Sequence, residues 1–161
     1  MTAYETIIEK IKQSDILKAE NMEEEIDIIR HKLKFLTEES LPNTLILAQQ
    51  NNYHPLYNDL IVEKVKVAGG ILMSEYATNV DCIIIKQDDE SLYSQIGGLL
   101  ESENIKNSNA IKNNNLFIIQ NKTFNESDEN YLADVEILAE ILQPKYFVYG
   151  RNGEDWVKFD L

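Results

Sequence analysis

The 161-residue sequence has few residues of the kinds that build metal centres, disulfides and sharp chain breaks. It contains one cysteine, two histidines, three prolines and six glycines. A single cysteine excludes a disulfide within the chain. Cys82 lies in the apolar run CIII, so we interpret it as a small buried core residue. His31 and His54 are far apart, so no histidine pair is available for zinc and no metal site is predicted.

Positive charge is also scarce. Lysine and arginine total 15 against 28 acidic residues, which gives a formal charge of −13. Such a surface repels phosphate backbones and anionic membranes, so we expect no nucleic-acid partner and no membrane insertion. No apolar run approaches membrane-spanning length, and the N-terminus lacks the features of a signal peptide. The sequence as given predicts a cytoplasmic protein, or a periplasmic one if it is a fragment of a longer precursor.

Catalytic motifs are missing as well. The sequence has no glycine-rich phosphate loop, no nucleophile elbow and no Ser/His/Asp arrangement. We therefore expect a non-enzymatic protein, predict no catalytic residue and identify no cofactor. A weaker alternative is an enzyme that uses the carboxylates of Asp88 and Asp89.

Two amphipathic segments open the chain. Residues 2–14 place their apolar side chains on one helical face, and Thr2 is a candidate N-cap. A second helix is expected from Asn21 to about Glu39, with Asn21 as its cap. Residues 1–40 are thus predicted to form two N-terminal helices that pack on the domain that follows.

Four short segments are expected to form strands, and residues 44–49 are a continuous apolar run typical of a strand that is covered on both faces. They span residues 44–49, 71–76, 82–87 and 116–120. Segments with helical periodicity alternate with them: residues 55–70, residues 88–102, and a long helix from Ser127 or Asp128 to Pro144. The alternation predicts an α/β fold over residues 41–147, a three-layer sandwich with a mostly parallel four-stranded sheet.

Three further expectations concern the intervening and terminal segments. Asp88 or Asp89 is expected to cap the helix over 88–102, and its internal Gly97–Gly98 indicates close packing by a neighbouring element. Residues 103–115 are rich in Asn, Ser and Lys and are expected to form a loop. In residues 148–161, aromatic and β-branched runs flank Asn152–Gly153, which predicts a C-terminal β-hairpin.

In a parallel α/β sheet, ligands bind beyond the carboxyl ends of the strands. The loops expected there are residues 49–54, 86–90 and 120–125. His54 either faces a ligand or begins the next helix, and Asp88 to Glu90 either bind a hard cation or cap a helix. The candidate ligand-binding residues in or near these loops are polar or aromatic: Gln50, Tyr53, His54, Tyr57, Gln87, Asp88, Asn121 and Asn125.

Five segments, in order, resemble the C-terminal lobe of the periplasmic substrate-binding proteins that serve ABC importers of iron-siderophore, haem and cobalamin. The similarity spans roughly residues 20 to 147. The segments are residues 22–36 followed by TLILAQ, then LIVEKVKVAGG, CIIIKQ, NAIKNNNLFIIQ and EILAEILQPKYF. The first lobe and signal peptide of that family are absent from this sequence.

The resemblance implies a planar or metal-chelate ligand held between two lobes. One lobe supplies one wall of such a cleft, and a homodimer could rebuild the second. The family commonly carries Pro and Arg in the loop before the last helix, and Asn130 stands where an Arg can face an anionic ligand. The resemblance thus adds Asn130 to the candidate binding residues.

Two functional hypotheses follow. The first is a binding domain for a small molecule of the metal-chelate, haem or cobalamin type. The alternative is a cytoplasmic protein–protein interaction or regulatory module without a small-molecule ligand. In that case the acidic surface, the leading helices and the hairpin would contact a protein partner.

Overall fold

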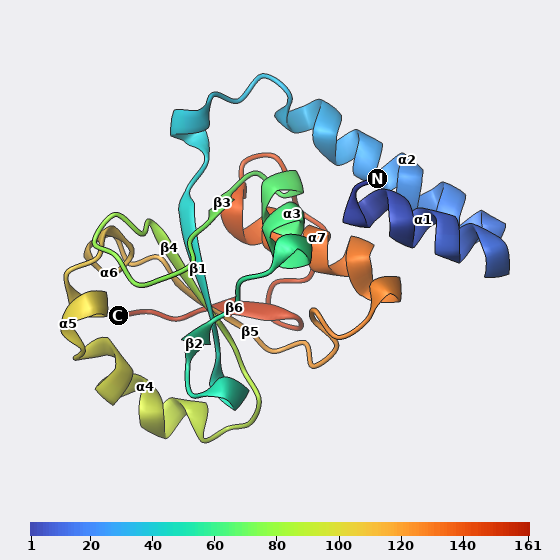
Figure 1. The fold of residues 1–161 in the computed structure, drawn as a ribbon. Coiled ribbons are helices and arrows are strands. Elements are labelled where there is room, and N and C mark those ends of the chain that lie inside the picture. The colour runs from blue at the N-terminus through green and yellow to red at the C-terminus, as the bar shows by residue number, and fades with distance from the viewer.

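The computed structural model describes residues 1–161 as a central sheet covered by helices on both faces (Figure 1). The strand order is β2-β1-β4-β5-β6, and β3 also pairs with β1. The four predicted strands are all present and run parallel to one another: β1 (Asn43–Ala48), β3 (Ile71–Leu72), β4 (Cys82–Lys86) and β5 (Leu116–Ile119). Two short strands add antiparallel edges: β2 (His54–Pro55) and β6 (Trp156–Lys158). The α/β sandwich is confirmed, with a mixed sheet of six strands.

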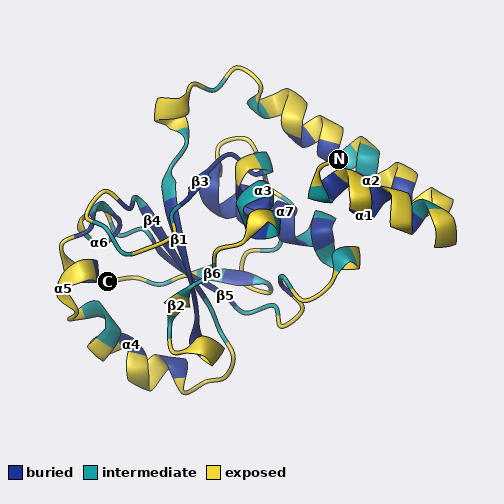
Figure 2. Cartoon of the chain, viewed as in Figure 1, coloured by how far each residue is buried: buried dark blue, intermediate teal, exposed yellow.

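Alternate residues of the strands face two separate cores. In β4, Ile84 belongs to the core on one face of the sheet, whereas Ile83 and Ile85 belong to the core on the other. All three are at most 1% exposed, which explains why the strand is a continuous apolar run (Figure 2).

The larger core is covered by four helices: α1 (Ala3–Ser14), α2 (Ile16–Leu33), α3 (Asp59–Val67) and α7 (Tyr131–Leu142). Helix α7 lies against the sheet, and nine of its 12 residues are buried. Helices α1 and α2 form an outer pair that projects from the body (Figure 1). The smaller core is covered by α4 (Leu92–Leu100), α5 (Glu103–Lys106) and α6 (Asn109–Lys112). None of the helices combines the length and apolar character needed to cross a bilayer.

The second helix begins earlier than predicted. It starts at Ile16, directly after α1, because the Asp15 carboxylate accepts a hydrogen bond from the Lys18 backbone N–H at 3.1 Å. Asn21 is therefore an interior residue and not a cap. The helix also ends at Leu33, before Glu39, and Glu38–Ser40 forms a separate 3-10 turn.

The helix expected from Pro55 begins at Asp59 instead, where the Asn58 side chain caps it. His54–Pro55 forms the edge strand β2. The cause is a tight reversal: Asn52 and Tyr53 adopt left-handed conformations, with φ values of 54° and 60°, and fold the chain back onto the end of β1.

The stop of this helix at Gly69–Gly70 is confirmed. Gly69 has a φ of +95°, which L residues with a side chain rarely adopt. A Cβ atom there would lie 2.7 Å from Gln143 Cγ, so the position also requires a residue without a side chain. The two glycines bring the end of α3 close to the end of α7.

The prediction of a C-terminal β-hairpin is wrong. Only its second half forms a strand, β6, which pairs with β5. The first half is held instead by the buried Glu140 carboxylate, which accepts backbone N–H groups from Tyr149, Gly150 and Arg151. The predicted turn at Asn152–Gly153 does form, and the Gly153 N–H donates to the Trp156 carbonyl at 2.7 Å.

Four local predictions around α4 to α7 also need correction. Residues 103–115 contain the short helices α5 and α6 and are not only a loop. Helix α4 starts after Ser91, and neither Asp88 nor Asp89 is its N-cap residue. A Cβ atom on Gly97 or Gly98 would meet nothing within 4 Å, so no neighbour packs closely there. The last helix is preceded by a 3-10 turn, Asp128–Asn130.

Candidate functional site

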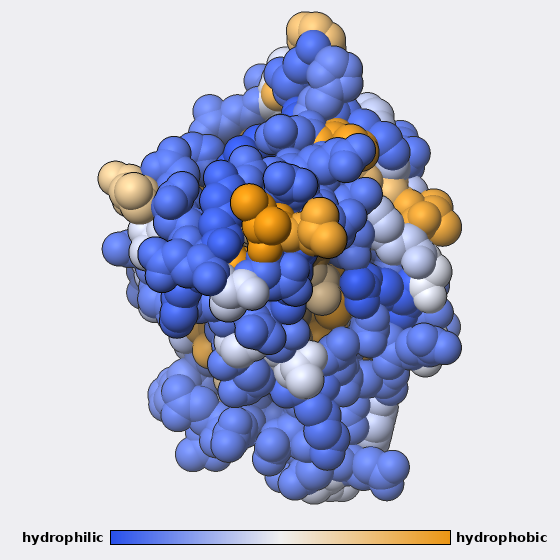
Figure 3. Space-filling view, turned by 90° about the vertical axis from the view of Figure 1, so that its right-hand side faces the viewer, coloured by the Kyte–Doolittle hydropathy of each residue, from blue (hydrophilic) through white to orange (hydrophobic).

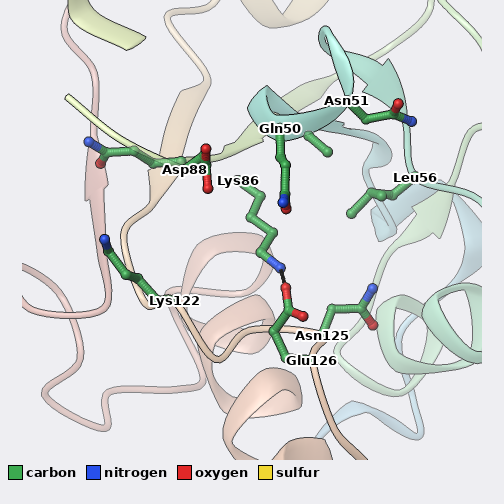
Figure 4. A pocket seen from close by; sticks show the side chains of 10 residues that line it. Gln50, Asn51, Leu56, Lys86, Asp88, Lys122, Asn125 and Glu126 are labelled. Atoms are coloured by element: carbon green, nitrogen blue, oxygen red, sulfur yellow. Dashed lines mark hydrogen bonds and ion pairs between the residues drawn. The ribbon is translucent and has the colours of Figure 1, made fainter. Parts of the chain in front are cut away.

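The three loops predicted to form a ligand-facing edge do meet at one rim of the sheet, because β1, β4 and β5 are parallel and end together. A cavity of about 420 Å³ lies between them (Figure 4). We call it the rim pocket, and it is defined by its lining residues: Ala48, Gln50, Asn51, Leu56, Lys86, Gln87, Asp88, Lys122, Asn125 and Glu126.

Four of the predicted binding residues line the rim pocket: Gln50, Gln87, Asp88 and Asn125. They come from the loops after β1, β4 and β5. These four residues therefore lie together at the carboxyl edge of the sheet, where the parallel strand order predicts them.

The other five predicted residues do not line the pocket. The Tyr53 hydroxyl donates to Gln95 Oε1 at 2.5 Å, on the side of α4. Asn121 donates to Asp155 Oδ1 at 2.8 Å, and Asn130 donates to the Thr123 carbonyl at 3.0 Å. His54 is exposed on β2, and Tyr57 is 54% exposed.

Sequence reasoning missed the charged lining residues Lys86, Lys122 and Glu126. Lys86 ends the apolar run of β4, and a cation at the carboxyl end of a buried parallel strand was the available signal. Lys122 gave no comparable signal, because its position depends on the conformation of the loop between β5 and α7.

The side chain of Gln49 ties two pocket loops together. Its Oε1 accepts the backbone N–H groups of Asp88 at 2.7 Å and Asp89 at 3.0 Å. Its Nε2 donates to Asp89 Oδ1 at 3.1 Å and to Ser91 Oγ at 3.0 Å. Hydrogen bonds from Ser91, and then from Gln49, lower the pKa of the Asp89 carboxyl. The end of β1 therefore fixes the loop that carries Gln87 and Asp88.

A buried ion pair fixes Asn125, the residue at the base of the pocket. Lys64 Nζ lies 2.8 Å from Asp134 Oδ2, and both side chains are 1% exposed. Lys64 also donates to Asn125 Oδ1 at 3.2 Å, and Asp134 accepts the Asn125 backbone N–H at 3.0 Å. Burial raises the pKa of Asp134, and the Lys64 ammonium acts against this shift. Asn125 has a φ of 60°, which these contacts stabilise.

The charges that line the pocket are two lysines and two acids. Lys86 forms an ion pair with Glu126 across the pocket (Figure 4). Lys122 and Asp88 form no ion pair within the chain. No group of three or more His, Cys, Asp or Glu side chains is arranged to hold a metal ion. The pocket can therefore recognise polar or charged groups, and it offers no set of ligands for a bare metal.

No protein-family model and no curated protein matches this sequence. Several solved structures do match the fold. An ABC transporter substrate-binding protein from Listeria monocytogenes superimposes on 88% of this chain with a TM-score of 0.64 and 17% identity. The chain has the fold of substrate-binding proteins. At this level of identity the match shows the fold alone.

Two further structures with the substrate-binding-protein fold come from other bacteria. The Helicobacter pylori protein CeuE, in a complex with nickel and histidine, covers 88% of this chain with a TM-score of 0.61 and 14% identity. A periplasmic solute-binding protein from Veillonella parvula covers 83% with a TM-score of 0.62 and 15% identity. This chain spans 63%, 51% and 45% of the lengths of the three proteins. These shares agree with the predicted correspondence to one lobe.

Proposed function

We propose that this chain is a non-enzymatic small-molecule-binding domain whose ligand occupies the rim pocket. The observation that carries the proposal is the position of the pocket: it lies at the carboxyl ends of three adjacent parallel strands on a substrate-binding-protein fold. Its lining comes entirely from residues 48–126. This supports residues 41–147 as the binding domain, with residues 1–40 and 148–161 packed against it.

The lining favours a hydrophilic metal chelate among the ligands that the resemblance implied. Only Ala48 and Leu56 are apolar lining residues, and no aromatic ring lines the pocket. Haem needs a broad apolar wall, whereas amide and charged side chains suit a ligand rich in hydrogen-bonding groups. The chain would contact the chelator and not the metal, because it has no metal-binding cluster. The nickel–histidine complex of the Helicobacter pylori neighbour is a ligand of this kind.

Calorimetric titration tests this proposal with nickel–histidine, ferric citrate, cyanocobalamin and haem as probes. We expect saturable binding of a hydrophilic chelate. Lys122→Ala should weaken it by about tenfold or more, since a hydrogen bond to a charged group contributes about 1.5–3 kcal/mol. Lys112→Ala is the matched control, because Lys112 is an exposed lysine of α6 outside the pocket. Absence of saturable binding by all four probes, or equal binding by Lys122→Ala and the wild type, would overturn the proposal.

A second candidate function is protein–protein interaction, and exposed apolar side chains on the α1–α2 pair favour it. Ile16 is 58% exposed, Leu17 is 74% exposed and Ile28 is 43% exposed. Figure 3 views the side on which this pair projects and shows a small hydrophobic group near the centre, with a few separate hydrophobic residues, in a mostly hydrophilic face. A second copy or another protein could cover these side chains.

Light scattering after size exclusion tests the version of this candidate in which the partner is a second copy. A homodimer through this surface should dissociate in the double variant Ile16→Ser/Leu17→Ser. Val148→Ser is the control, because Val148 is 87% exposed and lies near the opposite end of the sequence. A monomer at all concentrations would contradict the homodimer and leave the small-molecule proposal intact.

A further inference from the structure

We infer that the rim pocket selects an anionic ligand, such as a carboxylate-bearing chelate, and that Glu126 competes with this ligand for the Lys86 ammonium. The inference rests on the proposed function, and it adds the charge of the ligand and an internal competitor. Both parts of the inference depend on one difference between the ion-pair partners: Lys86 is held in the sheet, whereas Glu126 is exposed in a loop.

Lys86 is a fixed donor. It is the last residue of β4, its backbone is paired on both sides of the strand, and its side chain is only 15% exposed. Its stem therefore cannot move far without disturbing the sheet. An ammonium that is largely desolvated needs an anionic or acceptor group nearby.

Glu126 is a movable acceptor. It lies in the loop between β5 and α7, its side chain is 54% exposed, and Lys86 is its only side-chain partner. Because the Glu126 carboxylate is exposed, its own rotation into water costs little, on the order of the 0.2–1 kcal/mol of a surface pair. The desolvated Lys86 ammonium needs a replacement anion when Glu126 leaves. A ligand carboxylate that reaches the pocket can take its place on Lys86 Nζ.

Two other donors line the pocket, one on each side of the Lys86–Glu126 pair (Figure 4). Lys122 has no ion-pair partner in the chain, and its ammonium points away from Lys86, so it would contact a different part of the ligand. Asn125 presents its Nδ2 amide, because Lys64 occupies its Oδ1 and Asp134 accepts its backbone N–H. Apart from Glu126, Asp88 is the only acidic residue in the lining. Once Glu126 turns to solvent, two lysines face one carboxylate, and the lining carries a net positive charge.

The test compares Glu126→Gln with Glu129→Gln, using ferric citrate as the anionic probe and hexaamminecobalt(III) as a cationic one. Both variants remove one negative charge. Glu129, however, is 74% exposed, pairs with Lys18 and lies outside the pocket. Calorimetry should show that Glu126→Gln binds ferric citrate roughly two- to five-fold more tightly than the wild type. In this variant the ligand no longer has to break the Lys86–Glu126 ion pair before it binds Lys86. Glu129→Gln should bind it as the wild type does.

Lys86→Met completes the test, and circular dichroism of each variant verifies that it is folded. This variant should lose ferric citrate affinity by about tenfold or more. Weaker or unchanged citrate binding by Glu126→Gln, equal gains by both glutamine variants, or preference for the cationic probe would overturn the inference while leaving the pocket as a binding site. Failure of the wild type to bind any of the chelates would overturn the inference together with the proposed function.

Discussion

Trp156 Nε1 donates a hydrogen bond to Glu140 Oε1 at 2.9 Å, and this contact joins the edge strand β6 to the central helix α7. The Glu140 carboxylate is 4% exposed. Three backbone N–H groups of residues 149–151 complete its hydrogen bonds. One buried acid therefore holds residues 149–151 and Trp156 against α7.

Replacing Glu140 with Gln should destabilise the protein by about 2–3 kcal/mol. The amide nitrogen would face N–H donors, and at least one of them would lose its acceptor. Urea unfolding followed by Trp156 fluorescence measures the effect. Glu154→Gln, an exposed position in the same segment, should change the free energy of unfolding by less than about 0.5 kcal/mol. Equal effects of the two substitutions would contradict the role of Glu140.

Substitutions of the buried Lys64 and Asp134 are expected to have non-additive effects on the free energy of unfolding. Lys64→Met alone leaves a buried carboxylate without its cation and should cost about 3–5 kcal/mol. The double variant Lys64→Met/Asp134→Leu removes both charges and should recover most of this loss. Chemical denaturation of the single and double variants measures the coupling. If the double variant is as unstable as the sum of the two single variants, the pair is not coupled.

Buried tyrosines predict that stability falls at high pH. Burial raises the pKa of Tyr4 to about 12 and that of Tyr149 to about 12. In the unfolded chain both titrate near about 10. Above that pH only the unfolded state ionises, so their stabilising contribution is complete below about pH 10 and is lost as pH rises through about 12.

Urea unfolding at several pH values between 9 and 12 measures this alkaline loss, and absorbance of tyrosinate follows the ionisation. Tyr4→Phe should make the decline shallower, because it removes one of the shifted groups. Tyr146→Phe is the control, since Tyr146 is 42% exposed. A decline that is equally steep in Tyr4→Phe and the wild type would count against this explanation.

Replacement of Gly69 and of Gly98 by alanine is expected to change the stability of the protein in opposite directions. Gly69→Ala forces a side chain into a left-handed conformation and against Gln143, and it should destabilise the protein by more than about 1 kcal/mol. Gly98→Ala, in the open interior of α4, should stabilise it by up to about 1 kcal/mol. Thermal melting of both variants measures the two shifts. Destabilisation by Gly98→Ala would mean that a neighbour does pack on α4.

The elements that could be predicted from the sequence are those whose conformation depends on residues close to them in the chain. Continuous apolar runs such as 82–87 identify buried strands, because both faces of each strand are covered. Gly69 marked a helix end through its own backbone conformation. The convergence of Gln50, Asp88 and Asn125 followed from parallel strand direction alone.

The predictions that were wrong or missing concern features that depend on the folded conformation of other parts of the chain. The run around Tyr149 has strand-like composition, but Glu140, nine residues earlier in α7, takes its N–H groups. The edge strand at His54 depends on two consecutive left-handed residues that no simple pattern announces. The pairing of Lys86 with Glu126 joins residues 40 positions apart, and only the folded loop brings them together.

The centre of β4 is three isoleucines, divided between two cores. Sliding this strand by one position would exchange chemically identical side chains, so the middle of the strand cannot define its own alignment. The flanking charges do so instead. A shift one way drives Lys86 into the site of fully enclosed Ile85, and a shift the other way drives Asp81 into that of Cys82. Lys86, which lines the rim pocket, thus also fixes the alignment of β4 in the sheet.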